Sequence, residues 1–584
     1  MSNRSTRRRE WIVVLAFTIL GAVLRLWAAE RLGLEHFDEG IYALAGLWVL
    51  EPVGLPRFEP ELIPYAPPGF PMLVGLAYWL TFPFPGVSDF SAISPALLCG
   101  IATIPVVGWL GRRTFGPGAG AAAAALAAAS GPHVAFSRMA LTDVPFLLVW
   151  LVAMGLGARF LEQPRLGRAI VLGLAVGVAQ NLKYNGWLAG GIVALAVGLM
   201  LVAGPDHRRR AAWRVIGLGL LAAAVAALVY WPWYRFIEAH GGNAALLRHH
   251  RSYVGTLSTW PARWKLQMDE MVALSGQLWR PLSWGAIAWT LAWVGCAISA
   301  NGPRLVNRRA GAPWARLGIG LLVGTLVLGF LPNLPWWIGL GWLPWLLRED
   351  WPAVRLLGSW WLLMSVLTPL YHPYARLWLP VQAAGWLLLA GFLVKLGPFL
   401  NETAAADTPK PIARWPFRLT LGMGIGAVCL ALALWQRGPI AADRFGAPRL
   451  WPFPDLLAPT DSLRKAITAA QPLLQTTAPG LIVLARPPVL FYLALQGVPV
   501  RRVSSLDDLL RRAAPGELVL IDRVQLEQEE NSRRSSQLDQ RFEVVTIFPY
   551  QLPPTTLLDV DPAAAYGPEK HAQGRTALLL LRVR

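Results

Sequence analysis

Two carboxylates, Asp38 and Glu39, follow a long apolar run closely, in residues 36–42 (HFDEGIY). The run, residues 11–29, has about the length of a membrane-spanning helix and is interrupted mainly by Arg25. Carboxylates at a membrane boundary are costly to hold near lipid, so their presence indicates a functional site. A carboxylate in such a place could take the proton from an attacking hydroxyl group.

A second acidic site lies between two further apolar runs, in residues 137–143 (SRMALTD), and contains Arg138 and Asp143. Two more cations, Lys183 and Arg376, lie at predicted membrane boundaries on the same side. Cations can stabilise the charge that builds on a phosphate leaving group. Acids and bases at one membrane face therefore predict a reaction between a lipid-linked phosphate and an external acceptor. A structural ion pair between Arg138 and Asp143 is the simpler alternative.

The composition places the chain among polytopic membrane proteins. Its 584 residues are 55% hydrophobic and 15% charged, with a mean hydropathy of +0.44. Soluble domains usually carry about 25% charged residues. The net charge of +19 indicates loops held on the cytoplasmic side of the membrane rather than nucleic-acid binding. We therefore expect the lipid bilayer as a partner and no nucleic acid.

Charge and hydropathy together predict how the chain crosses the membrane. Basic residues 7–9 place the N-terminus in the cytoplasm, so the first span (11–29) delivers Asp38 and Glu39 to the outer face. Continued alternation of apolar runs and basic loops predicts about 13 transmembrane helices within residues 1–435. The predicted external loops are residues 30–92, which carry helices along the membrane surface, 136–143 and 234–283.

Two of these spans need separate mention. Residues 117–135 are predicted as one span, and their run of alanines suits tight packing between membrane helices. Residues 417–435 are predicted as the last span, which ends outside the cytoplasm.

Residues 436–584 show a different pattern, which predicts a small extracytoplasmic α/β domain. Leu506–Arg512 is expected to be a helix opened by Ser504 and Ser505. Short apolar segments predict strands at residues 481–485, 518–521, 542–548 and 577–583.

The acidic segments resemble those of a known family. Residues 37–43 (FDEGIYA) resemble the first-loop signature of the protein O-mannosyltransferase family, which includes the lipid A aminoarabinose transferases and belongs to the GT-C glycosyltransferases. Residues 66–70 (APPGF) resemble its Pro-Pro segment, residues 137–143 are similar to its second-loop Arg and Asp, and Lys183 lies where a lysine ends the fifth span. Residues 374–376 (YAR) resemble a weak form of its late basic-aromatic loop. The resemblance covers roughly residues 1–200, and the later spans match only in layout.

This resemblance implies a GT-C fold and a polyprenyl-phosphate-linked sugar as the donor. Asp38 would be the general base for the acceptor hydroxyl, which attacks the anomeric carbon directly and inverts it. Glu39 and Asp143 would orient groups or the acceptor. The cations would stabilise the polyprenyl phosphate that leaves. The substrate-binding residues expected on this basis are Arg138, Lys183, Tyr42, Arg376 and Tyr374.

Several features of the reaction stay open in the sequence. Mannose and aminoarabinose donors are both found among relatives, and the acceptor is a protein, a lipid or a glycan. The acids could bind a divalent metal, but no convincing ligand set is present, so we expect no metal and no other cofactor. Short loops and the lack of an organelle signal favour a bacterial inner membrane.

Other functions are weighed against this one. A lipid transporter or flippase predicts ionisable residues at mid-membrane and broken helices in paired halves, whereas the acids here lie at loop boundaries. A membrane-anchored ligand-binding protein would need neither so many spans nor acids beside them. An oligosaccharyltransferase would usually carry a Trp-Trp-Asp motif. The pairs at 336–337 and 360–361 are instead followed by aliphatic residues.

Overall fold

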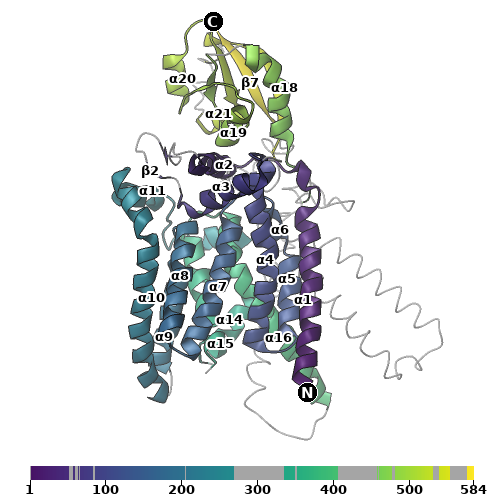
Figure 1. The fold of residues 1–584 in the computed structure, drawn as a ribbon, viewed down its shortest axis with the longest axis vertical. Helices are drawn as coiled ribbons and strands as arrows, with labels where there is room; N and C mark the ends of the chain where they lie inside the picture. Colours follow the sequence, from purple (N-terminus) through teal and green to yellow (C-terminus); the bar gives the residue numbers. More distant parts are fainter. Residues whose placement is uncertain are drawn as a thin grey trace, which may run out of the picture.

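The computed structural model consists of a bundle of helices with a C-terminal unit above one end, opposite the end that holds the N-terminus (Figure 1). The structure describes residues 2–50, 57–58, 63–64, 66–82, 86–203, 206–268, 334–348, 351–404, 457, 459–476, 480–529, 538, 540–552 and 575–584. The predicted span at 417–435, loop residues 269–283 and residues 436–456 lie outside these ranges.

Among the described residues, six helices are long and apolar enough to cross a membrane, or seven when a bent pair counts as one span. These helices make the protein a polytopic membrane protein, as its composition predicts. The helices that make up most of the six candidate spans are α1 (Ser2–Leu26), α4 (Asp89–Phe115), α7 (Asp143–Glu162), α10 (Asp206–Ala239), α15 (Pro352–Leu367) and α16 (Leu379–Ala404). The bundle also contains α8 (Leu166–Leu182), α9 (Leu188–Ala203) and α14 (Leu334–Arg348).

The segment predicted as one span, residues 117–135, is bent rather than straight. The segment forms α5 (Ala119–Ala128) and α6 (Gly131–Ser137), which meet at an angle of 57°. Pro132 stands in the first turn of α6, a position where its missing N–H costs no helical hydrogen bond, so it favours the start of a new helix here. The alanine run packs closely as expected, because a Cβ at Gly120 would lie 2.6 Å from the carbonyl oxygen of Gly108 in α4.

The side chain of Arg25 fills the bend between α5 and α6. Its guanidinium donates to the carbonyl oxygens of Gly21 (2.9 Å), Ala128 (3.0 Å) and Ala127 (3.2 Å), and lies 2.7 Å from Nδ1 of His133. The last carbonyls of a helix have no partner within that helix. The fully buried Arg25 therefore supplies the donors that the end of α5 lacks.

We expect Arg25→Met to lower the free energy of unfolding by about 3 kcal/mol. Two buried carbonyls at the end of α5 would lose their donor, at about 1–3 kcal/mol each. Thermal unfolding in detergent measures the effect, with Arg165→Met, at an exposed arginine, as the matched control. Equal melting temperatures for the two variants would contradict this account of the bend.

Surface helices lie across the end of the bundle that faces the C-terminal unit (Figure 1). They are α2 (Phe37–Leu50) and α3 (Gly69–Thr81), which fall in the loop predicted to carry such helices. Helix α1 ends at Leu26, short of the predicted residue 29, because Ala28 takes a left-handed backbone conformation with φ of +48°. The remaining short elements of this module are η1 (Ala29–Arg31), β1 (Arg57–Phe58), β2 (Ile63–Pro64), α11 (Asn243–Arg251), η3 (Thr368–Leu370) and η4 (Ala375–Trp378).

The C-terminal unit, residues 457–584, is built on a five-stranded sheet with the strand order β4-β3-β5-β7-β6. Strand β3 is parallel to β4 and β5, whereas β7 is antiparallel to β5 and β6. The strands are β3 (Ile482–Leu484), β4 (Arg501–Arg502), β5 (Leu518–Asp522), β6 (Phe542–Gln551) and β7 (Arg575–Val583). The helices are α18 (Ser462–Thr476), α19 (Pro487–Leu495), α20 (Leu506–Arg512) and α21 (Arg523–Glu529). The side chain of Ser505 caps α20 as predicted, and four of the strands occupy the predicted positions.

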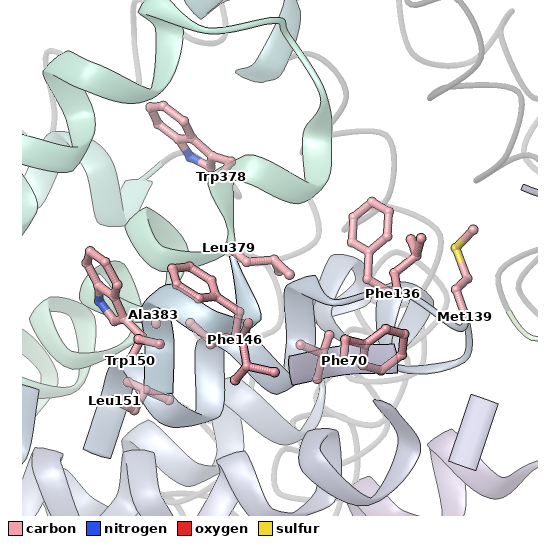
Figure 2. Packing of buried hydrophobic residues seen from close by; sticks show 14 of the residues in the cluster. Phe70, Phe136, Met139, Phe146, Trp150, Leu151, Trp378, Leu379 and Ala383 are labelled. Atoms are coloured by element: carbon pink, nitrogen blue, oxygen red, sulfur yellow. The ribbon is translucent and has the colours of Figure 1, made fainter. Parts of the chain in front are cut away.

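Large buried side chains pack where the surface helices meet the bundle. Figure 2 shows this packing, which joins residues of α3, α6, α7, η4 and α16. The ring of Phe146 lies 5.5 Å from that of Trp150, and Trp150 lies 6.4 Å from Trp360. This core fixes the starts of α7 and α16, beside which the charged residues lie.

Candidate active site

Four charged side chains meet at the end of the bundle that faces the C-terminal unit. Nη1 of Arg376 lies 2.7 Å from Oδ2 of Asp38 and 3.8 Å from Oδ2 of Asp143. Lys183 forms an ion pair with the other oxygen of Asp143. The structure therefore brings four of the predicted site residues together from four separate segments. We call Asp38, Asp143, Lys183 and Arg376 the charged quartet.

The local structure explains where the two acids lie. Asp38 stands in the first turn of α2 and Asp143 is the first residue of α7. The positive end of a helix dipole favours a negative charge at both positions. The Thr142 hydroxyl donates to the carbonyl oxygen of Leu182 at 2.7 Å, which joins the start of α7 to the end of α8. Lys183, the next residue, is thereby held beside Asp143.

Burial makes the pairing within the charged quartet necessary. The exposed fractions of the side chains are 8% for Asp38, 2% for Asp143, 10% for Arg376 and 20% for Lys183. Charges with so little access to water are costly unless they are paired. Two acids and two cations balance one another, so a substrate that brings its own charge must change these pairings.

Aromatic rings flank both cations. The guanidinium carbon of Arg376 lies 4.8 Å from the ring centroid of Tyr374, and Nζ of Lys183 lies 5.9 Å from that of Phe146. Such contacts favour a cation over the face of a ring. The predicted residue Tyr374 therefore lies in the site, in contact with Arg376.

Tyr42, another predicted substrate-binding residue, lies in α2 one turn beyond Asp38. Its ring meets Phe70 edge to face, with centroids 5.1 Å apart. Burial raises the pKa of the Tyr42 phenol well above its usual value, and the nearby charge of Asp38 raises that pKa further. Tyr42 is therefore a neutral hydrogen-bonding group beside the charged quartet.

Glu39 joins the two acidic segments rather than the charged quartet. Its Oε2 accepts from the backbone N–H groups of Glu35 (2.9 Å) and His36 (2.8 Å), and its Oε1 accepts from that of Ala140 (2.8 Å). Burial raises the pKa of Glu39. The carboxyl group thus ties the segment before α2 to the loop before α7, and so holds Asp38 and Asp143 in register.

Arg138 does not pair with Asp143, so the simple ion pair that the sequence allowed is wrong. Its Nη1 donates instead to the carbonyl oxygens of Arg25 (3.0 Å) and Trp27 (2.6 Å) at the end of α1. These carbonyls lack helical partners, which is why the arginine binds there. In the structure Arg138 caps α1 and is not a member of the charged quartet.

A shell of histidine and tyrosine side chains near the charged quartet is not among the predicted site residues. Nδ1 of His250 lies 3.0 Å from the Tyr371 hydroxyl, and the rings of Tyr184 and His250 are 5.2 Å apart. Tyr253 lies 5.8 Å from Tyr371 and 6.1 Å from His372. These residues come from three segments: the turn after α8, the end of α11 with the residues that follow it, and the loop after η3. The polar aromatic composition of these segments is visible in the sequence, but no local pattern shows that the segments turn toward the site.

The shell lies close enough to the charged quartet for the charge of Asp38 to affect a pKa within the shell. Burial raises the pKa of Tyr253, and the negative charge of Asp38 contributes to that rise. Rings and hydroxyls in such a position could bind a sugar or an acceptor.

A metal site is not apparent in the part of the chain that the structure describes. Within those residues no group of three His, Cys, Asp or Glu side chains is placed to hold a metal ion. The expected independence of metal stays a prediction.

Known proteins share this architecture. Residues 66–233 match the model of a family described as dolichyl-phosphate-mannose-protein mannosyltransferase. The crystal structure of ArnT from Cupriavidus metallidurans bound to undecaprenyl phosphate is similar over 97% of this chain and 97% of that chain, with 16% identity and a TM-score of 0.53. The chain has the fold of the GT-C glycosyltransferases.

The resemblance predicted from the sequence is therefore confirmed. The archaeal oligosaccharyltransferase AglB from Archaeoglobus fulgidus, solved with an inhibitory peptide and a dolichol-phosphate, gives a weaker likeness. It covers 89% of this chain and 70% of that chain, with 13% identity and a TM-score of 0.48. None of the curated proteins matches the sequence.

Proposed function

We propose that this GT-C protein transfers a sugar from a polyprenyl-phosphate-linked donor to a hydroxyl acceptor at the outer face of a membrane. The observation that carries the proposal is the charged quartet, in which Arg376 lies between the carboxylates of Asp38 and Asp143. A carboxylate, two cations and neutral tyrosines together suit a reaction that moves a proton and releases a phosphate.

In this mechanism the phosphate of the donor binds Lys183 and Arg376. Because the phosphate competes for the guanidinium of Arg376, Asp38 is released from its ion pair and its carboxylate becomes available to the acceptor hydroxyl. Asp38 takes the proton of the acceptor hydroxyl, whose oxygen attacks the anomeric carbon. The bond from that carbon to the phosphate oxygen breaks, and polyprenyl phosphate leaves with the electron pair.

The sugar is inverted, since one displacement occurs and no covalent enzyme intermediate forms. A phosphate leaving group needs little acid help, unlike the leaving alcohol in glycoside hydrolysis, for which hydrolases use paired carboxylates. The cations stabilise the developing charge instead.

The other residues have supporting roles in the proposal. Oδ2 of Asp143 accepts no hydrogen bond from the described residues, so it can orient a hydroxyl of the donor or the acceptor. Glu39 keeps the acids in register, and Tyr42 and Tyr374 contact the substrate. Arg138 holds α1, and its Nη2, which has no hydrogen-bond partner among the described residues, is available as a further donor to the lipid phosphate.

The proposal includes an orientation. The basic N-terminus lies at the opposite end of the bundle from the C-terminal unit, so we place the charged quartet and that unit outside the cytoplasm (Figure 1). We retain about 13 spans and a bacterial inner membrane as parts of the proposal.

Chelation by EDTA is expected to leave the rate of transfer unchanged within about twofold, because Lys183 and Arg376 supply the positive charge that a metal would otherwise supply. The rate of polyprenyl phosphate release, measured before and after dialysis against EDTA, checks this. Loss of activity that Mg²⁺ or Mn²⁺ restores would assign the two acids to a metal instead.

The proposed function is tested with purified protein and a panel of polyprenyl-phosphate sugars that includes mannose and aminoarabinose. Released polyprenyl phosphate is followed with and without an extract of the cell envelope as the acceptor. Release that depends on one sugar and on the extract supports the proposal and identifies the donor. Binding or transbilayer movement of the lipid with no release would favour a transporter.

A further inference from the structure

The C-terminal unit holds the segment directly before α2 by hydrogen bonds to the backbone of that segment. Gly33 N–H donates to Oγ1 of Thr460 at 2.9 Å, and Leu34 N–H donates to the hydroxyl of Tyr492 at 2.7 Å. The carbonyl oxygen of Glu35 accepts from Nη1 of Arg486 at 2.7 Å. Three successive residues of the membrane module are thus held by groups that lie more than 400 positions away in the chain.

The Glu35 side chain adds two more contacts with the unit. Its Oε1 accepts from the backbone N–H of Leu463 at 2.9 Å and from the Ser462 hydroxyl at 3.1 Å. Only 1% of Glu35 is exposed. Burial raises the pKa of Glu35 to about 8, against the opposing effect of these hydrogen bonds and of the Arg486 charge.

Arg486 is itself fixed from within the unit. Its Nε donates to Oδ2 of Asp522 at 2.6 Å and its Nη2 donates to the Tyr550 hydroxyl at 2.6 Å. Arg486 follows β3 and Asp522 ends β5, so both lie at the carboxyl ends of parallel strands. Open α/β sheets bind their ligands at that edge. Here the backbone of Glu35 occupies the edge.

Helix α2 also touches the unit directly at Gly40. A Cβ on Gly40 would lie 2.1 Å from the backbone nitrogen of Pro488 and 2.3 Å from the carbonyl carbon of Pro487. No side chain fits there unless α2 and α19 move apart. Gly40 lies two residues after Asp38, so such a movement reaches the charged quartet.

Further hydrogen bonds connect residues 33–36 to Asp38 and Glu39. The backbone N–H groups of Glu35 and His36 donate to Glu39, and the N–H of Asp38 donates to Nδ1 of His36. The position of Asp38 relative to Arg376 is therefore determined by residues 33–40, which the C-terminal unit holds.

We propose that the C-terminal unit positions the catalytic base: through Glu35, Gly40 and Arg486 it sets the distance between Asp38 and Arg376. These three are positioning residues that do not touch the substrate. The inference rests on the proposed function, since it gives Asp38 a reaction to serve.

Gly40→Ala tests this inference, with Gly219→Ala as the matched control. A Cβ at Gly219 in α10 meets nothing within 4 Å. We expect Gly40→Ala to lower kcat by about 100-fold, the scale of a misplacement of about 1 Å, and to leave the KM for the donor within about twofold. Gly219→Ala should match the wild type in both constants. A Gly40→Ala protein with normal kcat, or one with only a raised KM, would overturn the proposal.

Hydrogen exchange of residues 33–40 provides a readout that needs no turnover. Gly40→Ala should speed the exchange of the Leu34 and His36 amides, and Gly219→Ala should not. If the wild type transfers no sugar but the exchange responds as expected, the proposed function fails. The claim that the C-terminal unit holds residues 33–40 is then still supported. Unchanged exchange in Gly40→Ala would contradict the claim that the C-terminal unit holds residues 33–40.

Glu35→Gln probes the same contact without added bulk. Because burial raises the pKa of Glu35 from its usual 4.5 to about 8, the docked unit favours the protonated acid. Its contribution to stability is present at low pH and is lost as the pH rises toward 8. We expect the melting temperature of the wild type to fall over this window more than that of Glu35→Gln, which stays neutral. Melting temperatures that change with pH in the same way in both proteins would show that Glu35 does not affect the contact between the C-terminal unit and the segment before α2.

Discussion

Replacing Asp38 with Asn is expected to lower kcat by about 10³-fold, within the range found for loss of a general base. Asparagine keeps the size of the side chain and can still accept from Arg376, but it cannot take the proton of the acceptor hydroxyl. Binding of the donor should persist, because Lys183 and Arg376 remain. The rate of polyprenyl phosphate release and the affinity for the donor measure the two effects separately.

Asp507→Asn is the control for this substitution. Asp507 is an exposed acid in the first turn of α20, a position in its helix like that of Asp38 in α2. Its replacement should leave kcat unchanged. If Asp38→Asn and Asp507→Asn turn over equally fast, Asp38 is not the base, and Asp143 becomes the carboxylate to test.

Replacing Arg376 with Ala is expected to lower kcat/KM by about 10²- to 10³-fold, the scale of losing one group that stabilises a developing negative charge. The variant leaves Asp38 and Asp143 with Lys183 as the remaining cation of the charged quartet. Both binding of the phosphate and its departure should suffer, so KM should rise as kcat falls.

Arg376→Lys should recover only part of the loss. An ammonium group restores the charge but lacks the planar fork of donors that a guanidinium offers to two partners. Arg248→Ala, at an exposed arginine of α11, is the control and should behave like the wild type. Full activity of Arg376→Ala would exclude Arg376 from the reaction and leave Lys183 to bind the phosphate.

The members of the charged quartet could be predicted from the sequence because ionisable residues stand out in an apolar chain. Asp38, Asp143, Lys183 and Arg376 all lie at span boundaries on one predicted face. Their pairing could not be predicted. It depends on how α2, α7, η4 and the end of α8 pack, and no local pattern encodes that arrangement.

Arg25 and Arg138 are two further residues whose hydrogen-bond partners could not be predicted from the sequence. Both were visible as cations in or beside apolar runs, yet their partners are backbone carbonyls at helix ends. The bend between α5 and α6 creates one of these ends. The Gly131-Pro132 step at the start of α6 lies within an apolar run, and the run alone predicts one span without a bend.

The contact between Glu35 and Arg486 is the feature that the sequence is least able to predict. The strands and the capped helix of the C-terminal unit follow from short-range patterns, which is why their positions agree. The two partners are separated by 451 positions, and neither residue stands in a recognisable motif. Such a contact appears only when both modules are seen together.

The most direct test of the central claim uses wild-type and Asp38→Asn protein with a polyprenyl-phosphate donor labelled in the sugar. Label in the acceptor and free polyprenyl phosphate are measured in the same reaction. The account predicts that the wild type produces the two in a ratio of one to one, and that Asp38→Asn produces neither at a comparable rate while it still binds the donor. Label that stays on the lipid in both proteins, or equal transfer by both, would contradict it.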